Sequence, residues 1–244
     1  MRYFIEFSYN GTNYHGWQKQ PNANTVQDEM EKCMSVLLQE EIELMGAGRT
    51  DAGVHATQMF AHFDSDTIID SQKIVSKLNS FLPSDISIVR IFSVKKDIHA
   101  RFTAIGRTYK YYVSTEKNIF NPNTYLFFKK LDVNKMNEAC KYLLGEQDFT
   151  SFSKLHTDTF TNNCDITKAI WEQEGVNFVF TISANRFLRN MVRSVVGTLL
   201  DVGNGKIEGE EIKIIIEKKD RCSAGTSVPA KALFLTQVKY PNNI

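Results

Sequence analysis

The spacing of hydrophobic and polar positions changes period several times along the first half of the chain. Apolar and polar residues alternate over residues 3–9 and 86–94, as in half-buried β-strands. The predicted strands of this half are residues 3–9, 42–45, 54–63 and 86–94. A helix is predicted after Thr25, where apolar residues recur at steps of three and four and Asp28 completes a capping box. With a second helix over residues 69–81, the predicted order is βαββαβ.

The second half of the chain follows the same order. Its predicted strands are residues 108–113, 165–174, 176–183 and 231–239, and its predicted helices are residues 133–144 and 187–200. The two middle strands are expected to form a hairpin around Gly175. Two similar βαββαβ halves, residues 1–103 and 104–244, predict an α+β fold with mainly antiparallel sheets flanked by helices.

The composition restricts the class of protein. Of the 244 residues, 42% are hydrophobic and 23% are charged, which is typical of a globular protein and excludes a disordered one. We expect no membrane span and no signal peptide, because no apolar run is long enough and a strand pattern starts directly after Met1. The four cysteines are scattered and form no Cys-x-x-Cys pair, which favours reduced thiols in a cytoplasmic protein. The net charge of +1 means that any contact with RNA must come from a local basic face.

One glycine-rich segment carries candidate chemistry. In GAGRTDAGVHA, residues 46–56, glycines flank Asp51 and Arg49, so we expect a tightly bent loop that carries one carboxylate beside a guanidinium. Such a carboxylate suits a nucleophile or a base, but for a glycine-rich loop taken alone the favoured interpretation is a structural turn in which Arg49 is its ion-pair partner. Dinucleotide binding is disfavoured, since Gly53 is misplaced for that fingerprint and a strand follows it. Metal binding is disfavoured because Asp51 and His55 alone supply too few ligands.

The same segment resembles a known catalytic motif. GRTDAGVHA is similar to the motif of the bacterial TruA family of tRNA pseudouridine synthases. Further strings that resemble the family follow in order along nearly the whole chain: YNGTNYHGWQKQP, HARFTAIGRTYKYYV, LLGEQDFTSF and NRFLRNMVRSVVGTLLDVG. The resemblance implies an isomerase that converts uridine to pseudouridine at positions 38, 39 and 40 in the anticodon arm of tRNA.

The resemblance also implies how such an enzyme works. Asp51 is the essential residue, in a catalytic cleft between the two halves, with Arg49 beside it. The sequence does not decide whether Asp51 attacks the sugar, attacks the base or removes a proton. No redox step or group donor is needed, so we expect neither a cofactor nor a metal. The implied partner is tRNA, and the implied assembly is a homodimer.

Three further site residues come from the resemblance. Tyr109 corresponds to the family's active-site tyrosine, although alternation alone favours a core position for Tyr109 and Tyr111. Arg193 corresponds to an arginine near the catalytic aspartate, and Leu233 to an apolar residue that lines the pocket. The chain departs from the common pattern at a few neighbouring positions: Val228 replaces alanine, Ala232 replaces glycine and Ser194 replaces asparagine. None of these changes removes a catalytic group.

A basic face is predicted independently of the resemblance. Arg186, Arg189 and Arg193 are three and four residues apart, so they share one face of the predicted helix over residues 187–200. This face is either a solvated surface or one that meets tRNA phosphates or Asp51. Other basic residues that extend such a patch are Arg101, Arg107 and Lys110.

Two other functions compete with the enzyme. A non-catalytic RNA-binding module of the same fold is disfavoured by the presence of Arg49, Asp51, Tyr109 and Arg193 together. An oxidoreductase that uses the glycine-rich loop is disfavoured by the strand that follows the loop.

Overall fold

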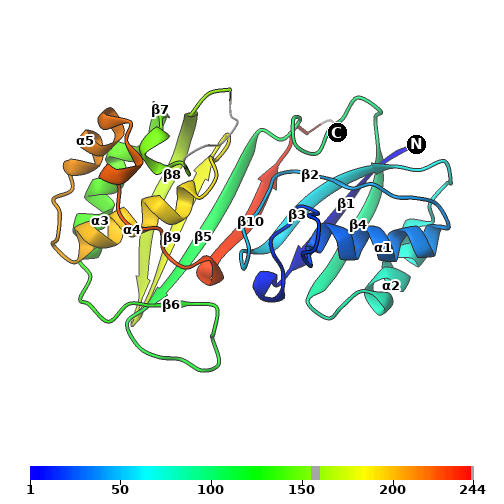
Figure 1. Cartoon of the computed structure of the whole chain (residues 1–244), viewed down its shortest axis with the longest axis horizontal. Coiled ribbons are helices and arrows are strands. Elements are labelled where there is room, and N and C mark those ends of the chain that lie inside the picture. Colours follow the sequence, from blue (N-terminus) through cyan, green and yellow to red (C-terminus); the bar gives the residue numbers. More distant parts are fainter. Residues whose placement is uncertain (155–159, 243–244) are drawn as a thin grey trace. The chain divides into compact units, whose positions relative to one another are not determined.

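The chain folds into two compact units. The computed structural model describes residues 1–154 and 160–242. Unit 1 contains residues Met1–Ile105 and the chain from Phe234 onward, and unit 2 contains Gly106–Leu233 (Figure 1). The sequence placed the last strand in the second half, residues 104–244. In the structure this strand, β10 (Leu233–Lys239), pairs in parallel with β3 of unit 1, with Phe234 opposite His55.

Unit 1 has the predicted βαββαβ order. Its elements are β1 (Arg2–Tyr9), α1 (Val26–Leu38), β2 (Met45–Gly46), β3 (His55–Asp64), α2 (Ser71–Phe81) and β4 (Ile86–Val94). The strands are ordered β4-β1-β3-β10, with β2 on β3, and all pairs are antiparallel except β3 with β10. Helices α1 and α2 lie together against one face of this sheet (Figure 1). The helices α1 and α2 and strand β4 are thereby confirmed, and β2 begins three residues later than predicted.

Local signals explain these elements. The Thr25 hydroxyl accepts the Asp28 N–H at 3.3 Å, which confirms the predicted cap of α1. Strand β1 differs from the half-buried strand that was expected, because both of its faces are covered. Phe4 is fully buried on the second face, where its ring meets that of Tyr240 at a centroid distance of 5.3 Å. A residue more than 200 positions away thus completes the core around β1.

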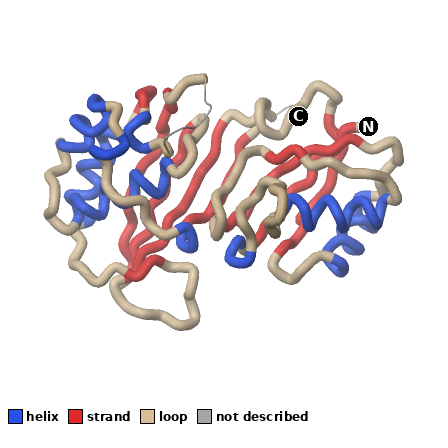
Figure 2. The backbone as a smooth tube through the Cα atoms, viewed as in Figure 1, coloured by secondary structure: helices blue, strands red, loops and turns tan. Residues whose placement is uncertain are grey.

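Unit 2 is built around mainly antiparallel strands. Its helices and longer strands are β5 (Gly106–Ser114), α3 (Val133–Cys140), β8 (Asn163–Glu174), β9 (Asn177–Ala184), α4 (Met191–Gly203) and α5 (Glu211–Lys218). The short strands are β6 (Tyr125–Leu126) and β7 (Gly145–Asp148). The strands are ordered β5-β9-β8-β7, with β6 parallel to β5. The helices gather on one face of the sheet (Figure 2). The hairpin β8–β9 around Gly175 is confirmed.

The prediction for α4 was wrong in two respects. The helix begins at Met191 instead of residue 187, because Asn190 adopts a left-handed conformation (φ 65°) that breaks the helical path. It is also buried on nearly every side, with Arg193 and Asp201 as its only residues that are not buried. A helix that is apolar all round belongs to the interior, so α4 is a core helix and not an amphipathic one. Helix α5 was missed, although Ile212, Ile215 and Ile216 bury one side of it.

Candidate functional site

Asp51 lies in the loop that joins β2 to β3. The side chain is partly exposed, and the loop is closed by hydrogen bonds at both ends. The Ala47 N–H donates to the Phe60 carbonyl at 2.8 Å, and the Val54 N–H donates to the Asp51 carbonyl at 3.1 Å. Asp51 therefore sits on a short bend directly before β3: the start of the loop is bonded to β3, and the bend is closed by its own backbone hydrogen bond.

The end of β1 and the segment that follows it also contact this loop, at Thr50. The Tyr9 and Thr50 hydroxyls are 2.9 Å apart, and the Thr50 carbonyl accepts the Trp17 N–H at 3.3 Å. Gly16 lies directly against the same carbonyl: a Cβ on Gly16 would be 2.3 Å from it. These contacts converge on the residue before Asp51. They were not identified from the sequence, although they fall in YNGTNYHGWQKQP, which resembles the family.

His55 has a structural position in this arrangement. It is buried, and its Nδ1 accepts the Gly11 N–H at 3.0 Å. Its ring stacks on that of Phe234 with centroids 4.4 Å apart. A Cβ on Gly11 would lie only 2.0 Å from the Val54 carbonyl, so the chain after β1 and the end of the Asp51 loop are in backbone contact.

Arg49 differs from its expected role as ion-pair partner. Its side chain is exposed, and within residues 1–154 and 160–242 it forms no ion pair with Asp51. Arg49 therefore lies at the exposed surface of the loop. Its assignment to the catalytic group stays a prediction.

The two tyrosines of β5 have different environments. Tyr111 is fully buried and donates its hydroxyl to the Pro229 carbonyl at 2.8 Å, and this burial raises the pKa of its phenol. Tyr109 is only partly buried, and its ring meets the edge of Phe187 at a centroid distance of 5.1 Å. Alternation alone favoured a core position for both tyrosines. This holds for Tyr111, while Tyr109 keeps part of its surface accessible.

Arg193 is fixed at the first turn of α4. Its Nε donates to the Val228 carbonyl at 2.7 Å, and the Val228 N–H donates back to the Arg193 carbonyl at 3.2 Å. Further along α4, Gly197 allows residues 225–228 to approach, since a Cβ there would lie 1.9 Å from the Thr226 carbonyl. The guanidinium is therefore oriented by a segment that is itself packed tightly on α4.

The predicted basic helical face does not exist. Arg186 and Arg189 precede α4 and lie in the loop after β9, so only Arg193 is helical. Arg186 donates to the Thr161 carbonyl at 3.1 Å, and Arg189 is exposed. The spacing of three and four residues was misleading because Asn190 interrupts the helix between them.

Leu233 begins β10 and is buried. It follows a short 3-10 helix, Ala230–Ala232, whose last residue is fully buried. An alanine is therefore accommodated at position 232, where the family commonly has glycine. The role of Leu233 in lining a pocket stays a prediction.

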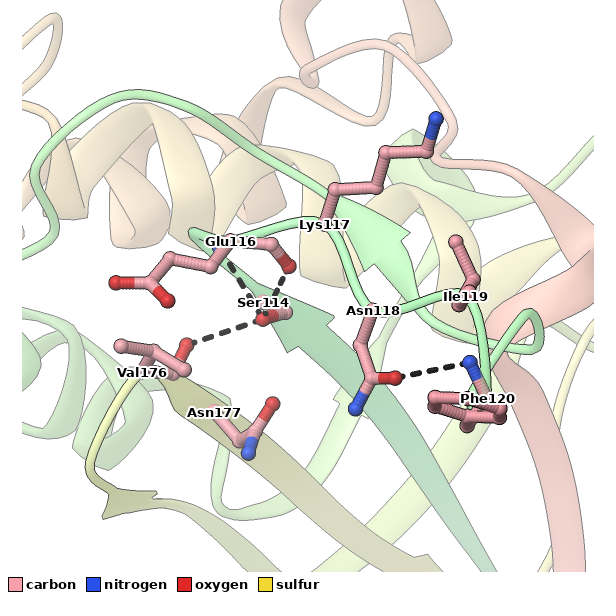
Figure 3. A pocket seen from close by; sticks show the side chains of 8 residues that line it. All are labelled: Ser114, Glu116, Lys117, Asn118, Ile119, Phe120, Val176 and Asn177. Carbon is pink, nitrogen blue, oxygen red and sulfur yellow. Dashed lines mark hydrogen bonds between the residues drawn. The ribbon is translucent and has the colours of Figure 1, made fainter.

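One open cavity of about 400 Å³ is lined by other residues. It lies at the β8–β9 turn and the loop after β5, and its lining includes Glu116, Asn118, Phe120 and Asn177 (Figure 3). The Ser114 hydroxyl at its base donates to the Glu116 carbonyl at 2.9 Å. None of the predicted site residues contributes to it.

Metal-binding clusters and membrane-spanning helices are both absent from the described part of the chain. Residues 1–154 and 160–242 contain no cluster of three or more His, Cys, Asp or Glu side chains that could hold a metal ion. The same residues form no helix of sufficient length and hydrophobicity to cross a membrane.

Comparisons with known proteins agree with the resemblance of the motifs. The sequence model of the tRNA pseudouridine synthase family matches residues 6–103 and 139–241. The chain is 55% identical to tRNA pseudouridine synthase A of Bacteroides thetaiotaomicron, over 100% of this chain and 92% of that protein. It is 54% identical to tRNA pseudouridine synthase A of Parabacteroides distasonis, over 100% of this chain and 97% of that protein.

A much weaker likeness connects the chain to a solved structure. The crystal structure of a Cbf5-Nop10-Gar1 complex matches 96% of this chain and 58% of that one, at 11% identity and a TM-score of 0.40. The family model and the two full-length relatives are sufficient by themselves to assign the family. The chain belongs to the tRNA pseudouridine synthase family, enzymes that isomerise uridine to pseudouridine in tRNA.

Proposed function

We propose that this enzyme isomerises uridine at positions 38, 39 and 40 in the anticodon arm of tRNA, with Asp51 as the essential group and without a cofactor. The observation that carries the proposal is the Asp51 loop, which presents one partly exposed carboxylate on a bend held from two directions. A carboxylate held in this way needs little reorganisation when it meets the reacting nucleotide.

A single carboxylate is consistent with the chemistry. The bond between the sugar and the ring nitrogen breaks, the uracil turns, and a bond forms between the sugar and a ring carbon. Glycoside hydrolysis uses two carboxyl groups because one of them activates water. Here the detached base is the group that returns, so no second carboxylate is required to activate water. Atoms and electrons balance within the nucleotide, which is why neither a cofactor nor a metal is needed.

Tyr109 and Arg193 are the proposed partners of Asp51. A target base must leave the stack before it reacts, which costs a few kcal/mol, and an aromatic ring that stacks on it offsets about 1–3 kcal/mol of that cost. Tyr109 is only partly buried, which leaves part of the residue accessible for this role. Arg193 is oriented by its hydrogen bond to Val228 and would stabilise the negative charge of Asp51 or of the detached base. Leu233 is the proposed apolar neighbour of the base.

The remaining parts of the proposal concern binding and assembly. Arg186 and Arg189 are proposed to contact the tRNA backbone, and Arg49 is proposed to belong to the catalytic group with Asp51. The enzyme is proposed to act in the cytoplasm as a homodimer, since tRNA is large relative to a chain of 244 residues. Light scattering at working concentration tests the dimer, and a monomer alone would contradict it.

The main test uses unmodified tRNA transcripts that carry uridine at only one of positions 38, 39 and 40. Base analysis after incubation should show pseudouridine at each of the three positions and none in a transcript whose uridines lie only in other arms. The Asp51→Asn variant should bind tRNA but form no product, because asparagine keeps the size of the side chain and removes the anion. Asp66→Asn is the matched control, since Asp66 is an exposed carboxylate of the same unit. Turnover by Asp51→Asn, or product only in another arm, would overturn the assignment.

A further inference from the structure

The turn after β4 exposes an arginine and a phenylalanine side by side. Arg101 is exposed, and Phe102 is 76% exposed. The Arg101 guanidinium carbon lies over the Phe102 ring, 5.5 Å from its centroid. Neither residue belongs to the Asp51 loop, and neither is among the proposed partners of Asp51, Tyr109 and Arg193.

The base of this turn is fixed in the core of unit 1. Ala100 is fully buried, and both of its backbone groups are bonded to side chains. Its N–H donates to His62 Nδ1 at 3.2 Å, and its carbonyl accepts the Tyr240 hydroxyl at 2.6 Å. The residue directly before the exposed pair is thus held by β3 and by the segment that follows β10.

His99 orders the exposed residues themselves. Its Nδ1 accepts the N–H groups of Arg101 and Phe102, at 3.1 and 3.3 Å, and its ring lies 4.4 Å from the Phe102 ring. Thr103 closes the turn: its N–H donates to the His99 carbonyl at 2.9 Å, and its hydroxyl accepts the His99 N–H at 2.9 Å. A ring nitrogen that accepts carries no proton, so both His62 and His99 act here as neutral rings. Burial lowers the pKa of both groups, that of His62 to about 4, which keeps them neutral near pH 7.

We propose that Arg101 and Phe102 form a tRNA-binding hook, in which an unpaired base of the tRNA stacks on the Phe102 ring or the Arg101 plane while the guanidinium meets a phosphate. Single-stranded nucleotides are recognised by stacking on aromatic rings and arginine planes, together with a nearby positive charge. An ordered turn loses little conformational freedom on binding, which favours affinity. The proposal rests on tRNA as the substrate and does not depend on the role of Asp51.

The positive charge beside Phe102 favours tRNA over a second copy of the chain as the partner that binds this turn. An exposed phenylalanine in a protein interface needs an apolar neighbourhood, whereas the Phe102 ring lies against the charged guanidinium of Arg101. A local positive field attracts phosphates in a protein whose net charge is only +1.

The experiment compares tRNA affinity among four variants of the full chain at fixed salt, with the oligomeric state measured in the same buffers. Phe102→Ala should weaken binding about 5- to 150-fold, the range found when a stacking aromatic is truncated, and Phe102→Tyr should retain near wild-type affinity. Arg101→Ala should weaken binding and reduce the slope of log affinity against log salt by about 0.7 to 0.9. Phe81→Ala is the matched control, because Phe81 is an exposed phenylalanine of the same unit at the end of α2.

Two results would overturn the hook. One is wild-type affinity in Phe102→Ala. The other is a change in oligomeric state in Phe102→Ala that accounts for the entire loss of affinity, which would assign the pair to contact with a second copy. Because the readout is binding, the result is independent of whether Asp51 proves essential for turnover.

Discussion

Replacing Gly16 with alanine should disable the enzyme without unfolding it. Gly16 has φ +93°, a conformation that residues with a Cβ rarely adopt, and its Cβ would lie 2.3 Å from the Thr50 carbonyl oxygen. A methyl carbon and an oxygen need about 3.2 Å, so the two segments must separate by about 1 Å. Thr50 directly precedes Asp51, and the displacement therefore reaches the carboxylate.

The size of the effect follows from this geometry. A displacement of about 1 Å at a catalytic group costs roughly 100-fold in rate. The left-handed backbone of an alanine costs about 1–2 kcal/mol of stability, and loss of the hydrogen bond from the Trp17 N–H to the Thr50 carbonyl adds about 1 kcal/mol. A domain of ordinary stability, about 5–15 kcal/mol, tolerates this sum and remains folded.

Gly205→Ala separates the two contributions. Gly205 has φ +74°, but a Cβ there would meet no atom within 4 Å, so this variant carries the backbone cost without the collision. The assay is single-turnover isomerisation of a tRNA transcript at saturating enzyme, with urea unfolding of each variant. We expect both variants to lose stability and only Gly16→Ala to lose rate. Full rate in Gly16→Ala would refute the argument that this contact positions Asp51.

Three further outcomes are expected. Arg193→Ala should lower the rate at saturating tRNA by roughly 100-fold, as removal of a positioned donor does, whereas Arg189→Ala should weaken binding and flatten its salt dependence; equal defects in binding alone would remove Arg193 from the catalytic group. Activity should survive dialysis against a chelator, and recovery with one specific metal, after tRNA folding is controlled, would contradict the cofactor-free reaction. The free energy of unfolding should fall as the pH drops from about 6.5 to 4, because the folded pKa of His62 is about 4 and the unfolded chain takes up this proton first. The His62→Asn variant should lose that part of the pH dependence in urea titrations, and an unchanged slope would contradict it.

Elements with strong local signals could be predicted from the sequence. Strand β4 has the predicted bounds, and α1 begins at the predicted Thr25 cap, because alternation and capping depend on neighbouring residues alone. The start of α4 could not be predicted, since a left-handed Asn190 is set by packing: its side-chain amide donates to the Ser227 hydroxyl at 2.5 Å. This error also affected the functional prediction, because it placed Arg186 and Arg189 on a helical face that does not exist.

The candidate site, too, could be predicted only in part from the sequence. The carboxylate in a glycine-rich loop was visible in the sequence, but its residues alone favoured a structural turn, and only the resemblance to the family motif pointed to a catalytic role. The exposed position of Arg49 and the different burial of Tyr109 and Tyr111 could not be predicted, because both depend on what packs against each residue in three dimensions. Alternation places two tyrosines on one side of a strand but does not reveal which of them lies at the end of the core.

The Asp51 loop and the segment after β1 pack against each other, and each depends on the other for its shape. Glycines that permit a tight bend also leave a loop mobile unless other groups restrain it. Here the restraints come from about 40 residues earlier in the chain: Tyr9 meets the Thr50 hydroxyl, Gly16 fits against the Thr50 carbonyl, and Gly11 fits against Val54. At both glycines the space for a side chain is already filled by backbone of the loop. The bend therefore keeps its shape only while both segments keep their glycines, and a substitution at Gly11 or Gly16 is expected to act on Asp51 as directly as one within the loop.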